Sequence, residues 1–504
     1  MFRNYLRSAF RILLQNKSYS ATNVLGLTLG LTAFTLISAY VHFETSFDRQ
    51  HTAGDRIYRV ESRFYKGDQL VNDWATSTNG YALAMKDNFP EIESYTRVNF
   101  SNSERVVRNT RRDLKFRETH VCFADSNFFS FFSYPLIEGD PHTALKNTNT
   151  VVVSQKAAKR YFGDANPIGQ FLDISTIAQT QHCMVTGIFA DFPANSTMQF
   201  DFLLAWAGSP EWQKTTWYLH ESYTYLRLKP GANSHTLETQ FPALAERYKN
   251  GPALKELKWA ITLVPLADIH LNTAKQYEIE TKGDRKAIRF LNGIALFILV
   301  IACINYINLS TARAVQRAKE IGIRKVSGAR RWQLAAQFLI ESLLMGSIAL
   351  VLTAGLVIFI GFLPIPYTLL FDGRLIIRVA AIFLAGVVAS GIYPALVLAA
   401  LKPVAVLKGR YSFSPAGIKI RKGLVVFQFA LSLLLIAGTL AVFRQIRFMM
   451  QQPLGVNITQ TLVIKSPVNT PDYTRKVTAL REAWLGLAGV SGVTRSGAIP
   501  GKEV

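Results

Sequence analysis

Five long apolar runs stand out along the chain, each close to the roughly twenty residues that cross the hydrocarbon core of a bilayer. They lie at residues 20–41, 287–309, 333–360, 376–400 and 423–443. The first run follows a long basic leader, and no small-residue cleavage site comes after it, which favours a retained anchor over a cleaved signal peptide. The pattern therefore predicts five transmembrane helices.

A long polar region, residues 43–286, separates the first two runs. Strand-like sequences occur in it at 57–65 (IYRVESRFY), 149–154 (NTVVVS) and 182–189 (HCMVTGIF), with helical patterns between them. One such helix is predicted to begin after Ser154 as the N-cap and to stop near Gly163. This alternation predicts a mixed α/β domain outside the bilayer.

Residues 1–19 precede the first run and are predicted to form an amphipathic helix that lies on the inner membrane surface. Its apolar and basic residues fall on separate stripes, Phe2, Leu6, Ala9 and Leu13 on one and Arg3, Arg7 and Arg11 on the other. The alternative is a plain basic flank that sets topology without forming a helix.

Basic residues collect in three short segments, which predicts that all three face the cytoplasm. They are the N-terminus, the segment 313–331 with seven Lys or Arg against one acid, and the linker 402–422 with six. The opposite connection, 361–374, has only Arg374. The N-terminus is thus predicted inside and the domain 43–286 outside. The formal charge of +22 indicates anionic lipid rather than nucleic acid as partner, because the basic residues cluster at the ends of apolar runs.

The segment 313–331 is also patterned as a helix. Glu320 precedes Arg324 by four residues, the favourable order for an ion pair on one helical face. A charged helix between two spans predicts a docking site for a cytoplasmic partner.

Polar residues inside the spans are the next candidates for function. Glu341 lies about two turns into the third span, where an ionisable group marks either a transport path or an interfacial or helix-packing contact. Asn305 and Asn308 are predicted to hydrogen-bond neighbouring helices, and Pro394 to kink or tighten the fourth span.

Signatures of catalysis are missing from the sequence. The eight histidines are scattered without metal-ligand spacing, and neither a nucleophile elbow nor a P-loop occurs. We therefore predict no catalytic residue, metal or cofactor in this chain, although a triad of distant residues would leave no motif. Cys122 and Cys183 lie in the external region, where we favour free thiols over a disulfide, and Cys303 is an ordinary small residue of a span.

A weak internal repeat organises these elements. Leu25 and Gly423, and likewise Tyr95 and Val493, are 398 positions apart, and a strand-like TLVIK at 461–465 follows the fifth run as IYRV follows the first. A second module is thus predicted to begin near residue 420 and to be cut short within its external domain, 444–504. A membrane sensor or a membrane-anchored external enzyme remain rival classes.

Several motifs resemble the MacB/FtsX-like family of ABC transporter permeases, in its larger two-module form with eight spans. In the membrane region they are EIGIRKVSGA at 320–329, QFLIES at 337–342, GIYPA at 391–395, and Pro403, Leu407 and Lys408. In the external region they are GDRIYRV at 54–60, FFSYPLIEGDPHTAL at 131–145, KRYFGDANPIG at 159–169 and VTGIFADFPANS at 185–196. Compared with that form, the resemblance implies that three spans are missing and that the sequence is truncated after the fifth.

The resemblance implies a non-catalytic subunit of the inner membrane that works with a separate pair of ATPase subunits, which bind ATP and Mg²⁺. It places the docking of that ATPase on the segment 313–331, at Glu320, Ile321, Gly322, Ile323, Arg324, Lys325, Gly328 and Ala329. Hydrolysis would move the external domain, a mode called mechanotransmission, for efflux, export or the handling of lipoproteins or peptides. A periplasmic adaptor or a cell-wall or lipoprotein partner is a further expectation.

Overall fold

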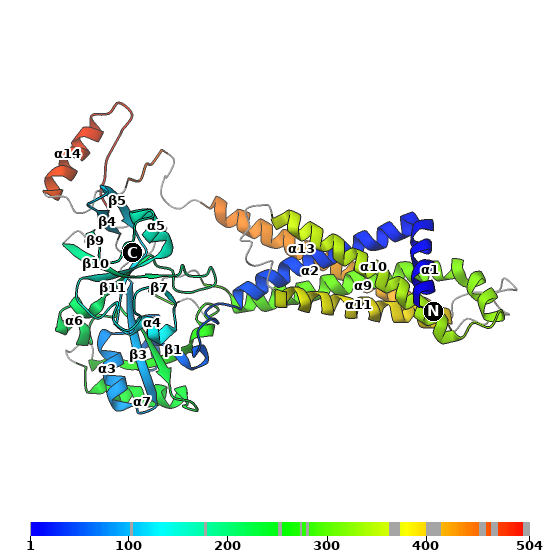
Figure 1. Cartoon of the computed structure of the whole chain (residues 1–504), viewed down its shortest axis with the longest axis horizontal. Helices are drawn as coiled ribbons and strands as arrows, with labels where there is room; N and C mark the ends of the chain where they lie inside the picture. Colours follow the sequence, from blue (N-terminus) through cyan, green and yellow to red (C-terminus); the bar gives the residue numbers. More distant parts are fainter. Residues whose placement is uncertain are drawn as a thin grey trace. The chain divides into compact units, whose positions relative to one another are not determined.

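The computed structural model divides the chain into two units. It describes residues 2–100, 104–175, 179–249, 255–272, 275–278, 282–361, 373–399, 415–452, 460–464 and 472–496. Residues Met1–Thr45 and Gly283–Asn457 form a helical unit, and Ser46–Lys282 with Ile458–Val504 form the second unit, which is built on a β-sheet (Figure 1). Pro403, Leu407 and Lys408, and most of the connection 361–374, lie outside the described residues.

The described residues of the helical unit form one short amphipathic helix and five long apolar ones. Their bounds are α1 Phe2–Gln15, α2 Lys17–Glu44, α9 Arg285–Val326, α10 Arg331–Gly361, α11 Gly373–Ala399 and α13 Pro415–Gln451. Apart from α1, each is long and apolar enough to cross a membrane, and each contains one of the five apolar runs. Two helices extend well beyond their runs: α9 continues through the basic segment to Val326, and α13 already begins at Pro415, within the predicted linker.

Close packing holds the first four long helices together. A Cβ atom built on Gly30 of α2 would lie 2.7 Å from Cβ of Ala302 on α9, and one built on Gly391 of α11 would lie 2.7 Å from Oγ of Ser342 on α10. Small residues at these positions let the helix backbones approach closely. Figure 1 shows these helices running alongside one another as a bundle.

The N-terminal helix α1 crosses the end of this bundle, in the dark blue segment of Figure 1. Ala9 and Leu13 are buried against the bundle, whereas Phe10 and Leu14 are 56% and 57% exposed. Arg7 and Arg11 are exposed as well. The helix therefore has three faces: one packed, one apolar and open, and one basic.

In the second unit, the described residues form a sheet of thirteen strands. The strands are β1 Ile57–Lys66, β2 Gln69–Trp74, β3 Ile92–Phe100, β4 Arg105–Asn109, β5 Leu114–Glu118, β6 Val121–Ala124, β7 Leu136–Glu138, β8 Thr150–Ser154, β9 Phe171–Ser175, β10 Thr180–Phe189, β11 Phe202–Ala205, β12 Tyr223–Leu228 and β13 Lys258–Pro265. Their order is β13-β1-β12-β3-β6-β11-β8-β10-β9-β4-β5, with β2 beside β1 and β7 beside β10. Most pairs are antiparallel, but β6–β11 and β8–β10 are parallel, which makes the sheet mixed.

Short helices cover the sheet. They are α3 Asn79–Asn88, α4 Phe128–Phe132, α5 Gln155–Phe162, α6 Glu211–Thr215 and α7 Ser234–Glu246, with 3₁₀ turns at Gly54–Arg56, Trp206–Gly208 and Leu266–Asp268. Tyr81 of α3 and Phe241 of α7 pack on Trp259 of β13, while Tyr161 of α5 packs with Val153 of β8 in a separate core. The predicted mixed α/β domain is confirmed.

The local sequence predictions between residues 43 and 286 agree with the structure at three strands and one capped helix. The three predicted strands are β1, β8 and β10. Ser154 caps α5 by accepting a hydrogen bond from the backbone N–H of Ala157 at 3.0 Å, and Gly163 follows the helix with a φ of +61°. Such a φ favours glycine and ends the helix. Cys122 and Cys183 are buried free thiols, as we favoured.

The prediction of a strand at TLVIK is wrong for its described part. Residues 461–464 have no regular secondary structure, and among the later residues that the structure describes, 472–496, there is one helix, α14, Tyr473–Leu485. A strand needs a neighbouring strand to satisfy its backbone N–H and C=O groups. The sheet order contains no strand from this part of the chain.

Candidate functional site

The basic segment is the last part of α9, and a defined motif ends it. Gly328 has a φ of +92°, its N–H donates to the carbonyl of Lys325 at 3.1 Å, and the N–H of Ala329 donates to the carbonyl of Arg324 at 3.0 Å. These two bonds form a Schellman motif, which requires the left-handed backbone that glycine adopts without cost. The chain therefore turns sharply here and enters α10 at Arg331.

Two of the predicted docking residues face inward. Ile321 is 2% exposed and packs with Leu334, Phe338 and Ala395, and Gly322 is also buried. These contacts join the end of α9 to α10 and α11. Ile321 and Gly322 therefore hold the segment on the bundle and do not present a surface to a partner.

An ion pair links α9 to α10 at the depth of Glu341. The carboxylate of Glu341, 7% exposed, accepts from Arg317 Nη1 at 2.6 Å and from Nη2 at 3.0 Å. Two parallel hydrogen bonds of this kind are the strongest form of an Arg–carboxylate contact. The carboxylate of Glu341 therefore joins α10 to α9 through this ion pair.

A chain of polar contacts connects this pair to the surface. Gln337 donates from Nε2 to Glu341 at 3.2 Å and accepts at Oε1 from Arg324 at 2.7 Å. Arg324 in turn pairs with Glu320 at 2.7 Å, the ion pair predicted from their spacing. The exposed Glu320 is thus linked by three contacts to a carboxylate buried between two spans.

The first spanning helix joins the same cluster. Tyr19 of α2 shares a hydrogen bond with Ser310 of α9 at 2.9 Å, and the guanidinium of Arg313 lies over the Tyr19 ring, 4.5 Å from its centroid. Tyr306 of α9 donates to Ser342 of α10 at 2.6 Å. Three spanning helices therefore meet through polar side chains at this end of the bundle.

The other polar residues predicted in the spans have varied surroundings. A Cβ atom built on Gly26 of α2 would lie 3.3 Å from the amide nitrogen of Asn305, so this amide packs at the α2–α9 contact. Within the described residues, Oδ1 of Asn308 is buried without a hydrogen-bond partner, so the predicted bond is missing at that atom. Pro394 is buried, and α11 continues past it to Ala399.

Apolar side chains are exposed at the end of α9. Ile323 is 52% exposed and Val326 is 67% exposed, three residues apart on one helical face. Trp332, in the first turn of α10, is 57% exposed. Lys319, Glu320, Arg330 and Arg331 are exposed around them. An apolar centre with a charged rim is the usual composition of a protein-docking surface.

Arg317 and Gln337 are functional candidates that the sequence analysis did not select. Arg317 is one of seven basic residues in its segment, and only its spacing of three from Glu320 distinguished it. Its partner Glu341 lies on another helix, 24 residues later, so the pairing depends on the turn at Gly328.

The external motif FPANS has a structural role. Asn195 donates to the carbonyl of Ser46 at 3.3 Å, and Asp48 accepts from Ser196 Oγ at 3.0 Å and from the N–H of Thr197 at 3.1 Å. This motif therefore ties the loop that follows residue 45 to the sheet domain. Across the ranges that the structure describes, no group of three or more His, Cys, Asp or Glu side chains is arranged to hold a metal ion.

Comparison with protein families matches both units. The MacB-like periplasmic core domain matches residues 20–244, and the FtsX-like permease C-terminal domain matches residues 292–403. A membrane permease with an external α/β domain after its first span is the class that these two matches and the fold define. The chain belongs to the MacB/FtsX-like family of ABC transporter permeases.

Curated relatives are exporters that join an ATP-binding part and a permease in their names. The pyoverdine export ATP-binding/permease protein PvdT of Pseudomonas aeruginosa is 24% identical over 417 residues, which are 80% of this chain and 58% of that protein. The macrolide export ATP-binding/permease protein MacB of Neisseria gonorrhoeae is 26% identical over 210 residues, 41% of this chain and 29% of that protein. The chain spans between half and three fifths of the PvdT-type relatives that it matches over most of its length.

Two solved structures are similar to part of this chain. A permease domain from Porphyromonas gingivalis is 21% identical, covers 48% of this chain and 98% of that domain, and has a TM-score of 0.38. The periplasmic region of MacB from Actinobacillus actinomycetemcomitans is 15% identical, covers 44% of this chain and 95% of that region, and has a TM-score of 0.30.

Proposed function

We propose that this chain is the membrane-spanning subunit that couples ATP hydrolysis by a partner to motion of its external domain. The observation that carries the proposal is the continuity of α9, a single helix from Arg285 to Val326. A spanning helix that continues without a break into an exposed surface at Ile323 and Val326 is suited to transmit a displacement along its axis.

The contacts at the end of α9 make this helix a lever for its neighbours as well. A partner that shifts Glu320 also acts on Arg324, Gln337 and Glu341 through the polar chain, and Ile321 carries the shift to α10 and α11 by packing. Packed interfaces of this kind move as units, because their side chains interdigitate. The motion would therefore reach several spans together.

The ATPase in this proposal lies outside these 504 residues. The sequence contains no P-loop, whereas the names of its curated relatives include an ATP-binding part. The partner is an ABC-type pair of ATPase subunits or domains that binds ATP and Mg²⁺, and this chain needs no cofactor. We place the protein in the inner membrane with its N-terminus and the end of α9 in the cytoplasm, because Lys and Arg collect in these short segments beside the spans, whereas the opposite short connection, 361–374, has only Arg374.

The proposed cargo class is that of the exporters to which the chain is related: small exported compounds, peptides or lipoproteins handled on the outer side. A periplasmic adaptor or cell-wall partner would then engage the sheet domain. The support for this part is the family membership alone.

The test is the stimulation of the partner ATPase by variants of the α9 end. Ile323→Asp and Glu320→Lys are expected to reduce stimulation at least tenfold. The first places a charge at an apolar position of the docking surface and the second reverses a charge, and central residues of such surfaces typically contribute about 2 kcal/mol or more. Membrane insertion and thermal stability should not change, since Ile323 and Glu320 are exposed.

Arg289→Glu is the matched control, because it reverses an exposed charge on the same helix at the other end. It should leave stimulation intact. Full stimulation by Ile323→Asp would show that the ATPase does not dock at the end of α9. An equal loss with Arg289→Glu would show a general defect of α9.

A further inference from the structure

A strongly basic pocket lies between α1 and the last turns of α9. It has a volume of about 650 Å³. Five arginines and one acid line it: Arg7, Arg11, Arg313, Arg317, Arg324 and Glu320. Guanidinium groups gathered in one pocket repel each other unless anions compensate them.

Only part of this charge is neutralised by the protein. Arg317 is bound to Glu341, and Arg324 to Glu320. No ion pair is found for Arg7, Arg11 or Arg313 among the residues that the structure describes. Arg313 is the most constrained of the three, because its guanidinium lies against the Tyr19 ring and its Nη1 atom is buried without a hydrogen-bond partner there. The pocket thus presents about three uncompensated positive charges and a buried donor.

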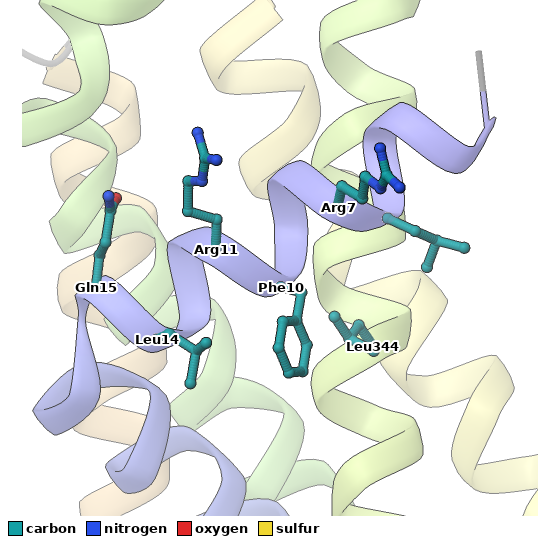
Figure 2. Close-up of a pocket in the computed structure, with 7 residues that line it drawn as sticks. Arg7, Phe10, Arg11, Leu14, Gln15 and Leu344 are labelled. Atoms are coloured by element: carbon teal, nitrogen blue, oxygen red, sulfur yellow. The ribbon is translucent and has the colours of Figure 1, made fainter.

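An apolar groove of about 750 Å³ lies along the same helix α1. It is lined by Leu6, Phe10 and Leu14 of α1 and by Leu344 of α10. Arg7, Arg11 and Gln15 line both this groove and the basic pocket. Figure 2 shows Arg7 and Arg11 on one side of α1 and Phe10 and Leu14 on the other, with Phe10 next to Leu344 of the third spanning helix. The helix therefore separates a charged compartment from an apolar one.

We propose that this place binds an anionic phospholipid of the cytoplasmic leaflet. Its phosphate would lie in the pocket between Arg7, Arg11 and Arg313, and its acyl chain would follow the groove at Phe10 and Leu14. Arginine binds phosphate oxygens through two parallel N–H bonds, and a ligand with both an anionic head and an apolar tail matches both compartments. A phosphate here would join α1 to α9 beside Glu320 and Arg324.

Lipid binding in this pocket does not depend on the docking of an ATPase. Its effect on coupling does rest on the proposed function. If the end of α9 receives the ATPase, a lipid held against it stiffens the receiving segment, and coupling then depends on anionic lipid. Lipid binding is measured without any ATPase, so the two proposals fail separately.

The test is titration of the purified full chain in neutral phosphatidylcholine nanodiscs or micelles with phosphatidylglycerol, followed by native mass spectrometry. Arg7→Gln, Arg11→Gln and Arg313→Gln are each expected to weaken the tightest site about fivefold, the usual contribution of one basic side chain to anionic lipid binding. Arg313→Lys keeps the charge and should retain most of the affinity, which separates loss of charge from misfolding.

Arg3→Gln is the matched control, because it removes one arginine from the same helix without touching the pocket. It should change the affinity less than twofold. An equal loss with Arg3→Gln would overturn the proposal in favour of diffuse surface charge.

A comparison of phosphatidylglycerol with glycerol phosphate distinguishes a lipid site from a site for a free phosphate ester. Glycerol phosphate, which has the head chemistry without acyl chains, should compete only at concentrations at least a hundredfold higher than the lipid. Phe10→Ala with Leu14→Ala should weaken lipid binding but leave glycerol phosphate unchanged, and Leu25→Ala, at an equally exposed position of α2, should change neither. Equal competition by glycerol phosphate would contradict a lipid site.

Discussion

A charged carboxylate between two membrane spans is stable only when a partner neutralises it, and the Glu341–Arg317 pair shows how this chain meets that condition. Both partners are largely buried, with 7% and 17% of their side chains exposed. Removing one partner of a buried pair leaves an uncompensated charge, which typically costs about 3 to 5 kcal/mol. Loss of either partner is therefore expected to lower the stability of the folded bundle.

We expect Glu341→Ala to lower the free energy of unfolding by about 3 kcal/mol, because Arg317 then stays buried without its carboxylate. Replacing both residues by methionine should recover most of this loss, since neither charge remains. Unfolding of the purified protein in detergent measures both effects. If the single and the double variant lose the same stability, the pairing is not the cause.

In the sheet domain, His220 lies among aromatic rings, with its ring centroid 4.9 Å from that of Trp74 and 5.1 Å from that of Phe64. Burial lowers the pKa of His220 to about 3. In the unfolded chain a histidine has a pKa of about 6.5. Between these values the unfolded state binds more protons, so the free energy of unfolding falls as the pH falls from about 6.5 towards 3.

We therefore expect the sheet domain to be about 2 kcal/mol less stable at a pH near 4.5 than at neutral pH through His220 alone. Urea unfolding followed by tryptophan fluorescence measures this difference. His220→Phe should remove most of that difference, and His142→Gln, at an exposed loop position, should leave it. An unchanged pH dependence in His220→Phe would assign the effect to other groups.

Residue-level prediction from the sequence succeeded where the partner is close in the chain. Ser154 and Ala157, and Glu320 and Arg324, are three and four positions apart, so helical geometry alone brings them together. The network around Arg59 was not predicted, because Arg59 pairs with Glu61 but also with Glu278, 219 positions away. Such contacts depend on the tertiary fold, which local patterns do not contain.

At the level of elements, apolar runs identified the spanning helices but not their ends. The sequence predicts a span at 287–309 and a separate helix within 313–331, whereas the structure joins them in the single helix α9, which ends at Val326; the basic segment contains no proline, and its charges support a helix. Apolar periodicity marks the part of a helix inside the bilayer. The end of a helix that continues beyond the apolar run is set by its capping residues, here Gly328 and its neighbours.

The contact of α2 with α9 gives a prediction at this scale. Gly30→Val is expected to destabilise the bundle by about 2 kcal/mol or more, because a Cβ at Gly30 would already lie 2.7 Å from Cβ of Ala302, and overpacking has such costs. Gly293→Val is the control, since no atom lies within 4 Å of its built Cβ. Thermal unfolding in detergent compares the two variants. Equal losses would point to helix propensity rather than to packing.

For the whole molecule, the sequence separated the spans from the sheet domain, since apolar runs and Lys and Arg density are properties of long segments. The strand order β13-β1-β12-β3 joins strands from both ends of the domain, and no local pattern encodes it. Membrane topology, the side of the bilayer on which each segment lies, is therefore the large-scale feature that the sequence predicts most directly. It is also one that labelling in cells can test.

We expect single cysteines at Lys159 and Lys319 to react on opposite sides of the membrane. Both positions are exposed, and Cys122 and Cys183 are buried, so only Cys303 needs replacement for a low background. A membrane-impermeant maleimide should label Lys159→Cys once any outer membrane is opened, because α2 carries the chain across the bilayer between the basic N-terminus and the sheet domain. Lys319→Cys should react only after the inner membrane is lysed. Labelling of Lys319→Cys in cells with an intact inner membrane would reverse the topology, and would place both the basic pocket of α1 and the end of α9 beyond the reach of a cytoplasmic ATPase.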